Sequence, residues 1–449
     1  MNEEAFLFAV LAGPRSDCSP MGLGLDDFMS DAGAVGFRDD RGWLFSPEPL
    51  KLAPAEVSQL ERLGHPLRMF QQGCDRIYRR SVKGTLPSWI AGLLDSGKPE
   101  WLVKAQQSED LRDVAPRVIR PDLLMTENGF ALTELDAVPG GMGITGWLSQ
   151  RYGAEGYRLV GGSAGMVEGF RSLMPSGGEV LISEESVDYR PEMEWLVNAL
   201  NEAAEGPWGI ASAEAFQESD SSDKLYRFFE LFDWEAIPAL SSLSRCRNLT
   251  PPCKPHFEEK LWLALLWSPS LREVWDAEMR GSHLQRIREL VPYGWVVDPI
   301  PLPPHASLPR LEVHSWQQLG DFSQKQRRLV LKVSGFSELA WGSRGVVIGH
   351  DVSREEWVEA LSAACEGFEN QPHLLQEFRE AKLLEHPYFD PVTGSRKMMR
   401  GRARLCPYYF VDEEGGIELG GCLAAIVPAD KKKIHGMRDA ILTVCEVGE

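Results

Sequence analysis

The sequence predicts a mixed α+β and α/β fold, in which a layer of parallel strands is inserted between antiparallel hairpins. Residues 179–234 alternate between strand and helix at the spacing of a small Rossmann-like layer. Residues 123–135 and 403–428 show apolar runs on either side of short turns, a pattern typical of antiparallel hairpins. The chain of 449 residues is long enough for two or three domains.

The first predicted segment covers residues 1–173. Apolar side chains recur every three or four positions across residues 54–80, which predicts helix. Residues 123–126 then form a predicted strand, residues 127–129 a turn, and residues 130–135 the return strand.

The second predicted segment, residues 174–249, is the Rossmann-like substrate domain. Strands are predicted at 179–185 and 208–216, a helix at 190–205, and helix or a strand–helix mixture at 223–234. The segment contains no GxGxxG sequence, so no dinucleotide is indicated.

The third predicted segment, residues 250–449, begins with a helix over residues 250–267 and a proline-rich link over residues 291–309. The predicted strands lie at 328–336, 345–349 and 373–380, the predicted helix at 354–367 and a long hairpin at 403–428. Helices mixed with antiparallel strands indicate an α+β domain.

The composition excludes several classes of protein. With 66 acidic and 47 basic residues, the net charge is −19, and no basic face is available for nucleic acid. We expect no membrane span, since no apolar stretch of about eighteen residues exists. Acidic residues precede the first apolar run, which argues against an export signal and for a cytoplasmic protein.

The eight cysteines have no CxxC pairing and are expected to be reduced thiols rather than zinc ligands. The sequence is compatible with a homodimer.

Two carboxylates stand one residue apart in the return strand of the first hairpin. Glu134 and Asp136 point to the same face because side chains alternate along a strand. Such a pair is unfavourable unless a metal cation, a basic side chain or water lies between the two groups. Three glycines follow within a few residues, Gly140, Gly141 and Gly143. Glycine allows a tight backbone turn at this place.

Lys332 ends an apolar strand and precedes a loop that contains Gly342, Ser343 and Gly345. A lysine followed by glycine-freed backbone N–H groups suits a phosphate clamp. The alternative is an ordinary hairpin with a solvated lysine.

Other polar residues are each open to two interpretations. Lys260 lies in an apolar helical stretch, where it either snorkels to solvent or points into a cleft. Arg120 either reaches the face of Glu134 or pairs with a neighbouring acid. Arg404, at the start of an apolar strand, is expected to have a charged partner. Residues 376–378 either end a core strand or turn polar groups toward a nucleobase.

The order of these motifs resembles the circularly permuted ATP-grasp enzymes, with a layout similar to eukaryotic glutathione synthetase and the glutathionylspermidine synthase-like proteins. The motifs are Arg-x-Asp-Leu-Leu, Glu-x-Asp before Gly-Gly, a Rossmann-like segment, Lys260, Leu-Lys before a glycine loop, and Gln-Glu-Phe. The resemblance covers residues 120–449. It implies an ATP-grasp-like fold of circularly permuted order with an inserted Rossmann-like substrate domain.

The resemblance also implies roles for individual residues. The implied magnesium ligands are Glu134, Asp136 and Glu338; the implied nucleotide-binding residues are Lys260, Lys332, Gly342, Ser343, Gly345, Gln376, Glu377 and Phe378; the catalytic candidates are Arg120, Lys332 and Arg404. Asp136 stands where the family has Asn, and the loop lacks the family's consecutive glycines.

The function that follows from the resemblance is an ATP-dependent carboxylate–amine ligase that works through an acyl phosphate. Its cofactors would be ATP and Mg²⁺, and its partners a small carboxylate and a small amine. The alternative is a catalytically inactive nucleotide-binding protein with a regulatory or scaffold role. A third reading is a small-molecule kinase on the same fold.

Overall fold

The computed structural model of the protein describes residues 42–203, 206–217, 224–340, 342, 344–434 and 438–448. Cys18, Ser343 and the N-terminal residues that were judged for an export signal lie outside these ranges. Within them, the chain forms a mixed α/β structure with three sheets, which confirms the predicted mixture of helices and strands.

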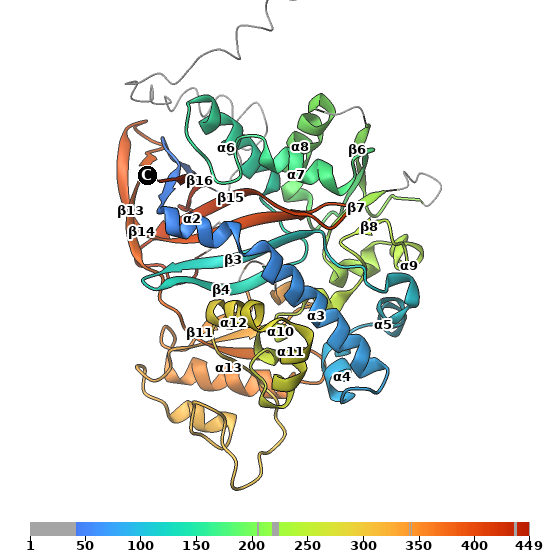
Figure 1. Cartoon of the computed structure of the whole chain (residues 1–449). Helices are drawn as coiled ribbons and strands as arrows, with labels where there is room; N and C mark the ends of the chain where they lie inside the picture. Colours follow the sequence, from blue (N-terminus) through green and yellow to red (C-terminus); the bar gives the residue numbers. More distant parts are fainter. Residues whose placement is uncertain are drawn as a thin grey trace, which may run out of the picture.

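The largest sheet has eight strands and crosses the middle of the molecule (Figure 1). Its strands are β1 (Leu44–Phe45), β2 (Leu50–Leu52), β3 (Val118–Thr126), β4 (Gly129–Asp136), β13 (Leu383–Phe389), β14 (Arg396–Val411), β15 (Ile417–Pro428) and β16 (Ile441–Val447). The order is β1-β16-β15-β14-β3-β4, with β13 beside β14 and β2 beside β16. Both predicted hairpins, β3–β4 and β14–β15, are therefore confirmed and lie in one sheet.

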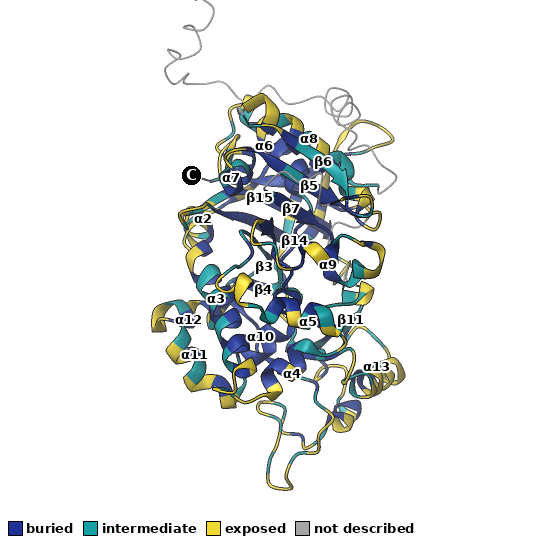
Figure 2. Ribbon diagram, turned by 90° about the vertical axis from the view of Figure 1, so that its right-hand side faces the viewer, coloured by how far each residue is buried: buried dark blue, intermediate teal, exposed yellow. Residues whose placement is uncertain are grey.

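The two faces of this sheet are covered by different helices because side chains alternate along each strand. On β14, Leu405 belongs to the core shared with α3 (Gly64–Val82), whereas Cys406 belongs to the core shared with α6 (Met142–Ala154) and α7 (Gly165–Leu173). Figure 2 shows the buried residues concentrated on the strands between these helices.

The Rossmann-like layer is confirmed as a four-stranded parallel sheet in the order β6-β5-β7-β8. Its strands are β5 (Gly178–Ile182), β6 (Trp208–Ser212), β7 (Leu225–Phe228) and β8 (Leu249–Thr250), and α8 (Arg190–Ala203) connects β5 to β6. The helix packs back on the parallel sheet, as expected for a crossover connection.

The third sheet is antiparallel, in the order β11-β10-β12-β9. Its strands are β9 (Gly294–Val296), β10 (Leu329–Val333), β11 (Val346–Ile348) and β12 (His373–Glu377). Helix α13 (Arg354–Glu366) connects β11 to β12. The predicted strands and helix of this region are confirmed. The predicted link at 291–309 is wrong in part, because β9 lies within it and pairs with β12.

The predicted helix at 250–267 is also wrong in part. The structure has a short 3₁₀ turn, Pro255–Glu258, and then only α10 (Leu261–Leu265). Pro251, Pro252 and Pro255 explain the difference, because proline lacks an N–H and breaks a helical hydrogen-bond ladder. Lys260 consequently caps the start of α10 instead of lying inside a helix.

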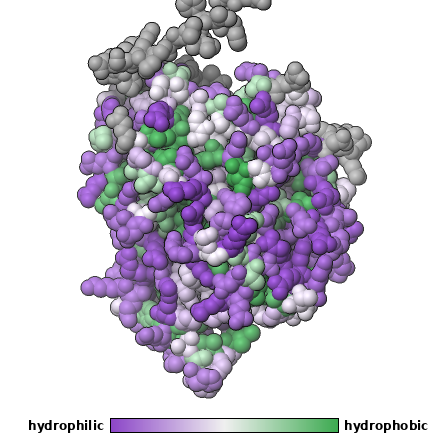
Figure 3. All heavy atoms as spheres, in the orientation of Figure 1, coloured by the Kyte–Doolittle hydropathy of each residue, from purple (hydrophilic) through white to green (hydrophobic). Residues whose placement is uncertain are grey.

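The remaining helices are α2 (Pro54–Glu61), α4 (Trp89–Asp95), α5 (Glu100–Gln107), α9 (Leu240–Leu243), α11 (Arg272–Glu278) and α12 (Gly281–Leu290). Of these, α4, α11 and α12 pack against α3. In the described part of the chain, no helix combines the length and apolarity needed to cross a bilayer. The face of the molecule seen in Figure 3 is mostly hydrophilic, with apolar spots scattered over it.

The division into three domains remains a prediction. The eight-stranded sheet contains strands from the first and third predicted segments.

Candidate functional site

The β3–β4 hairpin carries a bulge at the place where its carboxylates begin. Leu123 pairs with Leu132 and Asp122 with Glu134, so Thr133 is an extra residue without a partner. The Thr133 hydroxyl donates to the Asp122 carbonyl at 3.1 Å. Bulges of this kind redirect the side chains that follow them. Beyond the bulge, Glu134 and Asp136 lie on the same face of β4.

Arg120 neutralises one of these carboxylates. Its Nη2 lies 2.6 Å from Asp136 Oδ2, and its Nε lies 3.1 Å from Asp122 Oδ1. Arg404 Nη1 donates to the other Asp122 oxygen at 2.7 Å. Burial would raise the pKa of Asp122, but Arg120 and Arg404 outweigh burial and lower it. The pKa of Asp136 is raised, because burial and the charge of Glu134 exceed the effect of Arg120.

Lys260 neutralises the second carboxylate. Its Nζ lies 2.8 Å from Glu134 Oε1 and donates to the Ala340 carbonyl at 2.9 Å. Burial alone would lower the pKa of Lys260, but Glu134 raises it above the ordinary value. The positive groups beside the paired carboxylates are therefore basic side chains, Lys260 and Arg120. Lys260 is buried and does not snorkel to solvent.

Lys332 reaches the hairpin from the antiparallel sheet. Its Nζ donates to the Thr133 carbonyl at 2.8 Å and to Gln376 Oε1 at 2.9 Å. Only 7% of Lys332 is exposed, so the reading of a solvated hairpin lysine is wrong. Burial lowers the pKa of Lys332 to about 8, with Glu134 acting in the opposite direction.

A small cavity lies where the hairpin, the parallel layer and the loop after β10 meet. We call it the acidic cavity; it is lined by Glu134, Leu135, Asp136, Ala137, Glu230, Phe232, Glu258, Lys260, Gly335, Phe336, Ser337 and Ala340. Four of these residues are carboxylic acids, and Lys260 is the basic one.

Two of the acids, Glu230 and Glu258, were not found by sequence reasoning. Glu258 is held by Arg227, whose Nη2 lies 2.7 Å from its Oε1. Burial raises the pKa of Glu230 well above its ordinary value, and the charges of Glu258 and Asp136 raise it further. Glu230 had a signal in the sequence, its position two residues after β7, because ligand sites of parallel sheets lie beyond the carboxyl ends of strands.

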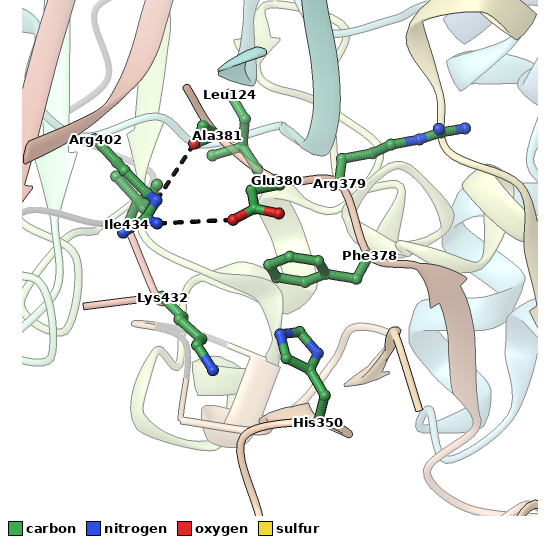
Figure 4. Close-up of a pocket in the computed structure, with 9 residues that line it drawn as sticks. All are labelled: Leu124, His350, Phe378, Arg379, Glu380, Ala381, Arg402, Lys432 and Ile434. Carbon is green, nitrogen blue, oxygen red and sulfur yellow. Dashed lines mark hydrogen bonds and ion pairs between the residues drawn. The ribbon is translucent and has the colours of Figure 1, made fainter. Parts of the chain in front are cut away.

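A second cavity lies beside the end of β12, and we call it the Phe378 cavity. It is lined by Leu124, His350, Phe378, Arg379, Glu380, Ala381, Arg402, Lys432 and Ile434. Figure 4 shows Phe378, His350 and Lys432 gathered around the same space. The rings of Phe378 and His350 are 4.5 Å apart, edge to face. Four of the nine lining residues are apolar and five are polar or charged, so the Phe378 ring presents a flat face beside basic side chains.

Lys332 joins the end of β12 to the β3–β4 hairpin. It binds Gln376, two residues before Phe378, and Thr133, one residue before Glu134. Gln376 is 2% exposed, and its Nε2 has no hydrogen-bond partner among the described residues. The backbone N–H groups of Glu377 and Phe378 are already bonded to the Tyr293 and Arg328 carbonyls. A ligand would therefore meet this segment through side chains and carbonyls.

The remaining predicted residues are more dispersed. Glu338 is exposed and does not line the acidic cavity, although its neighbours Ser337 and Ala340 do. Gly342 adopts a positive φ of 59° in an exposed turn. Gly345 binds the Leu339 carbonyl through its N–H and closes the loop. Within the described ranges, no three His, Cys, Asp or Glu residues are grouped so that they could hold a metal ion.

Comparison with known proteins identifies relatives by structure alone. No protein-family model matches the sequence, and no curated protein matches it. A glutathione synthetase-like effector from Globodera pallida, solved in its apo form, matches with a TM-score of 0.55 and 10% identity, over 96% of this chain and 98% of that one. A protein described as a gamma-glutamylcysteine synthetase from Methylobacillus flagellatus gives a TM-score of 0.39 and 12% identity, over 84% and 85% of the two chains, and nothing below rests on it. The chain therefore has a glutathione synthetase-like fold.

Proposed function

We propose that this protein is an ATP-dependent carbon–nitrogen ligase with a circularly permuted ATP-grasp architecture, which joins a small carboxylate to a small amine through an acyl phosphate. The single observation that supports it best is the position of the buried Lys332. Its Nζ binds Gln376, two residues before Phe378, and Thr133, one residue before Glu134, so it stands between the strand that leads to the Phe378 cavity and the hairpin that lines the acidic cavity.

This arrangement suits a nucleotide. The Phe378 ring offers a flat surface for a base, and Gln376 Nε2, which has no partner among the described residues, offers a donor two residues earlier in the chain. Lys332 and Lys260 are placed for the phosphates, as point charges with several donors each. Arg120 and Arg404, both of which bind Asp122 in this structure, are the candidates to bind the substrate carboxylate.

The donor set of the acidic cavity is suited to magnesium in part. Its candidate ligands are carboxylate oxygens, which hard divalent cations prefer. Glu134 and Asp136 would hold the ion, but each is bound by a basic side chain here and Glu338 lies apart from them. When bound, magnesium would neutralise charge on the phosphates. The chain itself positions the reacting groups and excludes water.

The test compares nucleotide binding by the wild type, Lys332→Met and Lys325→Met. A buried charge-assisted hydrogen bond contributes about 1.5–3 kcal/mol, so Lys332→Met should weaken ATP binding by about ten- to a hundredfold. Lys325 is exposed just before the same strand and serves as the matched control. Isothermal titration with ATP, ADP and adenosine measures the change. Equal ATP affinity in wild type and Lys332→Met would contradict a nucleotide site here.

The inactive nucleotide-binding alternative is favoured by one observation: the two candidate metal ligands, Glu134 and Asp136, are each bound by a basic side chain. ADP release separates the two functions. A ligase should release ADP only when a carboxylate and an amine are both supplied, and mass spectrometry should find the amide product. ATP binding without ADP release under any such pair would support the binding protein.

A further inference from the structure

Lys98 and Glu259 form an ion pair that is shut off from solvent. Lys98 Nζ lies 2.5 Å from Glu259 Oε1, and the two side chains are 0% and 1% exposed. Lys98 belongs to the connection between α4 and α5 (residues 96–99), whereas Glu259 belongs to the segment that leads into α10. Removing one partner of an ion pair buried this completely is strongly destabilising, so each partner holds the other in place.

Glu259 stands between two residues of the acidic cavity. Its chain neighbours, Glu258 and Lys260, both line that cavity. Glu259 itself lies outside the lining, and its carboxylate is bound by Lys98. The ion pair therefore anchors the backbone directly between two residues of the site.

Ser334 extends this anchor to Lys260. Its hydroxyl donates to Glu259 Oε2 and accepts the Leu261 N–H at 3.0 Å, and its carbonyl accepts the Lys260 N–H at 3.2 Å. Ser334 is fully buried and follows β10, two residues after Lys332. The start of α10, which presents Lys260, is thereby fastened to the end of the strand that presents Lys332.

Lys98 also contacts the loop that follows β10. The Phe336 ring, which lines the acidic cavity, has its centroid 5.3 Å from Lys98 Nζ. A Cβ on Gly335 would lie 2.5 Å from the Glu258 carbonyl oxygen, so this loop packs against the segment before α10 without room for a side chain. The loop and the segment that carry these residues of the acidic cavity therefore meet at the buried ion pair.

The connection that carries Lys98 is held by close contacts of its own. A Cβ on Gly97 would lie 2.0 Å from the Asn370 carbonyl oxygen. The Ser96 hydroxyl donates to the Glu369 carbonyl. Both contacts are to the turn that precedes β12. Lys98 is thus presented from a fixed backbone.

We propose that Lys98 is a positioning residue, which holds Lys260 and Phe336 in the wall of the acidic cavity. It acts on Lys260 through Glu259 and Ser334, and on the aromatic ring by direct contact. Groups of a site keep their geometry only when the residues behind them are themselves fixed. An effect of Lys98 on ATP binding rests on the proposed function, whereas its effect on the position of Lys260 does not.

The first measurement needs no ligand. Lys98→Met removes the charge and keeps most of the length of the side chain. Hydrogen–deuterium exchange with mass spectrometry should be about tenfold faster in peptides that contain residues 260–261 and 334–340, because their hydrogen bonds depend on the anchor. Peptides of β5 and β7 should exchange as in the wild type, since the change is local. Lys104→Met, which replaces a lysine of α5 that is 64% exposed, is the matched control.

The second measurement is nucleotide titration of the same three proteins. Lys98→Met should weaken ATP binding by about tenfold and leave adenosine binding unchanged, because only the phosphates would meet Lys260. A residue that serves stability alone would change the folded fraction and not the affinity of the folded protein. Measurable ATP binding of equal strength in wild type and Lys98→Met would overturn the proposal, as would unchanged exchange at residues 260–261.

A second variant covers the case in which Lys98→Met does not fold. The double change Lys98→Met with Glu259→Gln leaves no unpaired charge at this place in the interior, so it should fold. Glutamine keeps an oxygen for the Ser334 hydroxyl and loses the ionic contact with residue 98. Exchange at residues 260–261 should therefore still exceed that of the wild type. Wild-type exchange there in the folded double variant would overturn the proposal.

The outcomes separate the positioning role from the nucleotide site. Faster local exchange in Lys98→Met, with no ATP binding by the wild type, would keep the positioning role and remove the proposed ligase. ATP binding by the wild type, with unchanged local exchange in the variant, would keep the nucleotide site and remove the positioning role.

Discussion

At the scale of single residues, the site is built from ions that neutralise one another. Glu134 and Asp136 are side by side because Lys260 and Arg120 bind them, and Lys332 is buried because Thr133 and Gln376 accept its hydrogen bonds. An isolated buried charge would cost several kcal/mol. Each of these charged side chains therefore depends on a specific neighbour.

Under the proposed function, Lys332 would make nucleotide binding dependent on pH. Its pKa is lowered to about 8 by burial, so it loses its proton at a pH where other lysines remain charged. In the unfolded chain a lysine keeps its proton up to about pH 10.4. The free energy of unfolding therefore rises with pH between the folded pKa of about 8 and this value. Phosphate binding needs the charged form of Lys332, so the affinity for phosphate falls as pH rises.

The expected result is that ATP affinity falls about tenfold between pH 7 and pH 9, from one proton lost above pH 8. Lys332→Arg should remove most of this dependence, since arginine stays charged. Titration calorimetry across the pH range measures both proteins. A wild-type affinity that stays constant to pH 9 would show that Lys332 does not contact the phosphates.

At the scale of elements, the glycines after the paired carboxylates serve packing as well as turning. Gly141 has a φ of 88° and starts α6. A Cβ on Gly143 would lie 1.9 Å from the Glu192 carbonyl of α8. The Glu192 carboxylate in turn accepts the Gly141 N–H at 2.8 Å. Glycine is needed here because α6 and α8 approach so closely.

Gly143→Ala should push α8 away and destabilise the protein by about 1–3 kcal/mol, the usual cost of overpacking. Gly92→Ala on α4 is the control: nothing lies within 4 Å of its Cβ position, so the helix should gain up to about 1 kcal/mol. Thermal and urea unfolding of both variants measure the difference. A Gly143→Ala protein as stable as the wild type would mean that α8 moves without cost.

The sequence predicted most of these elements and few of their partners. The strands of β3–β4, β10–β12 and β14–β15 were recognisable because their apolar patterns and turns are local. β9 was hidden in a proline-rich stretch and is a strand only because it pairs with β12. Glu230 and Glu258 were missed because their proximity to Glu134 arises from the parallel layer meeting the hairpin, which no local pattern records.

At the scale of the whole molecule, a buried ionic network connects the N-terminal helices to the site. Asp75 on α3 lies 2.8 Å from Lys254 Nζ and 3.1 Å from His256 Nε2. The ring of Tyr78 stacks on His256 at 4.7 Å. This network fixes the segment that leads to Lys260, so distant helices position a residue of the site.

Asp75→Asn should lower the free energy of unfolding by about 3–5 kcal/mol, because Lys254 then remains buried without a counter-charge. The double change Asp75→Asn with Lys254→Met should recover part of the loss, since no buried charge remains between them. Asp110→Asn, an exposed aspartate, is the control. Urea unfolding together with ATP titration measures stability and site geometry. If the single variant were as stable as the wild type, the network would have no role in holding this segment.

The pairing of Lys260 with Glu134 has a further consequence for the order in which ligands arrive. A nucleotide phosphate that takes Lys260 leaves Glu134 with an uncompensated charge, and a divalent cation that takes Glu134 leaves Lys260 without its partner. Either ligand alone would have to break the Lys260–Glu134 ion pair and leave one charge uncompensated. Both ligands together would compensate both charges. Under the proposed function, nucleotide and metal binding would be thermodynamically coupled, each raising the affinity for the other by the same factor.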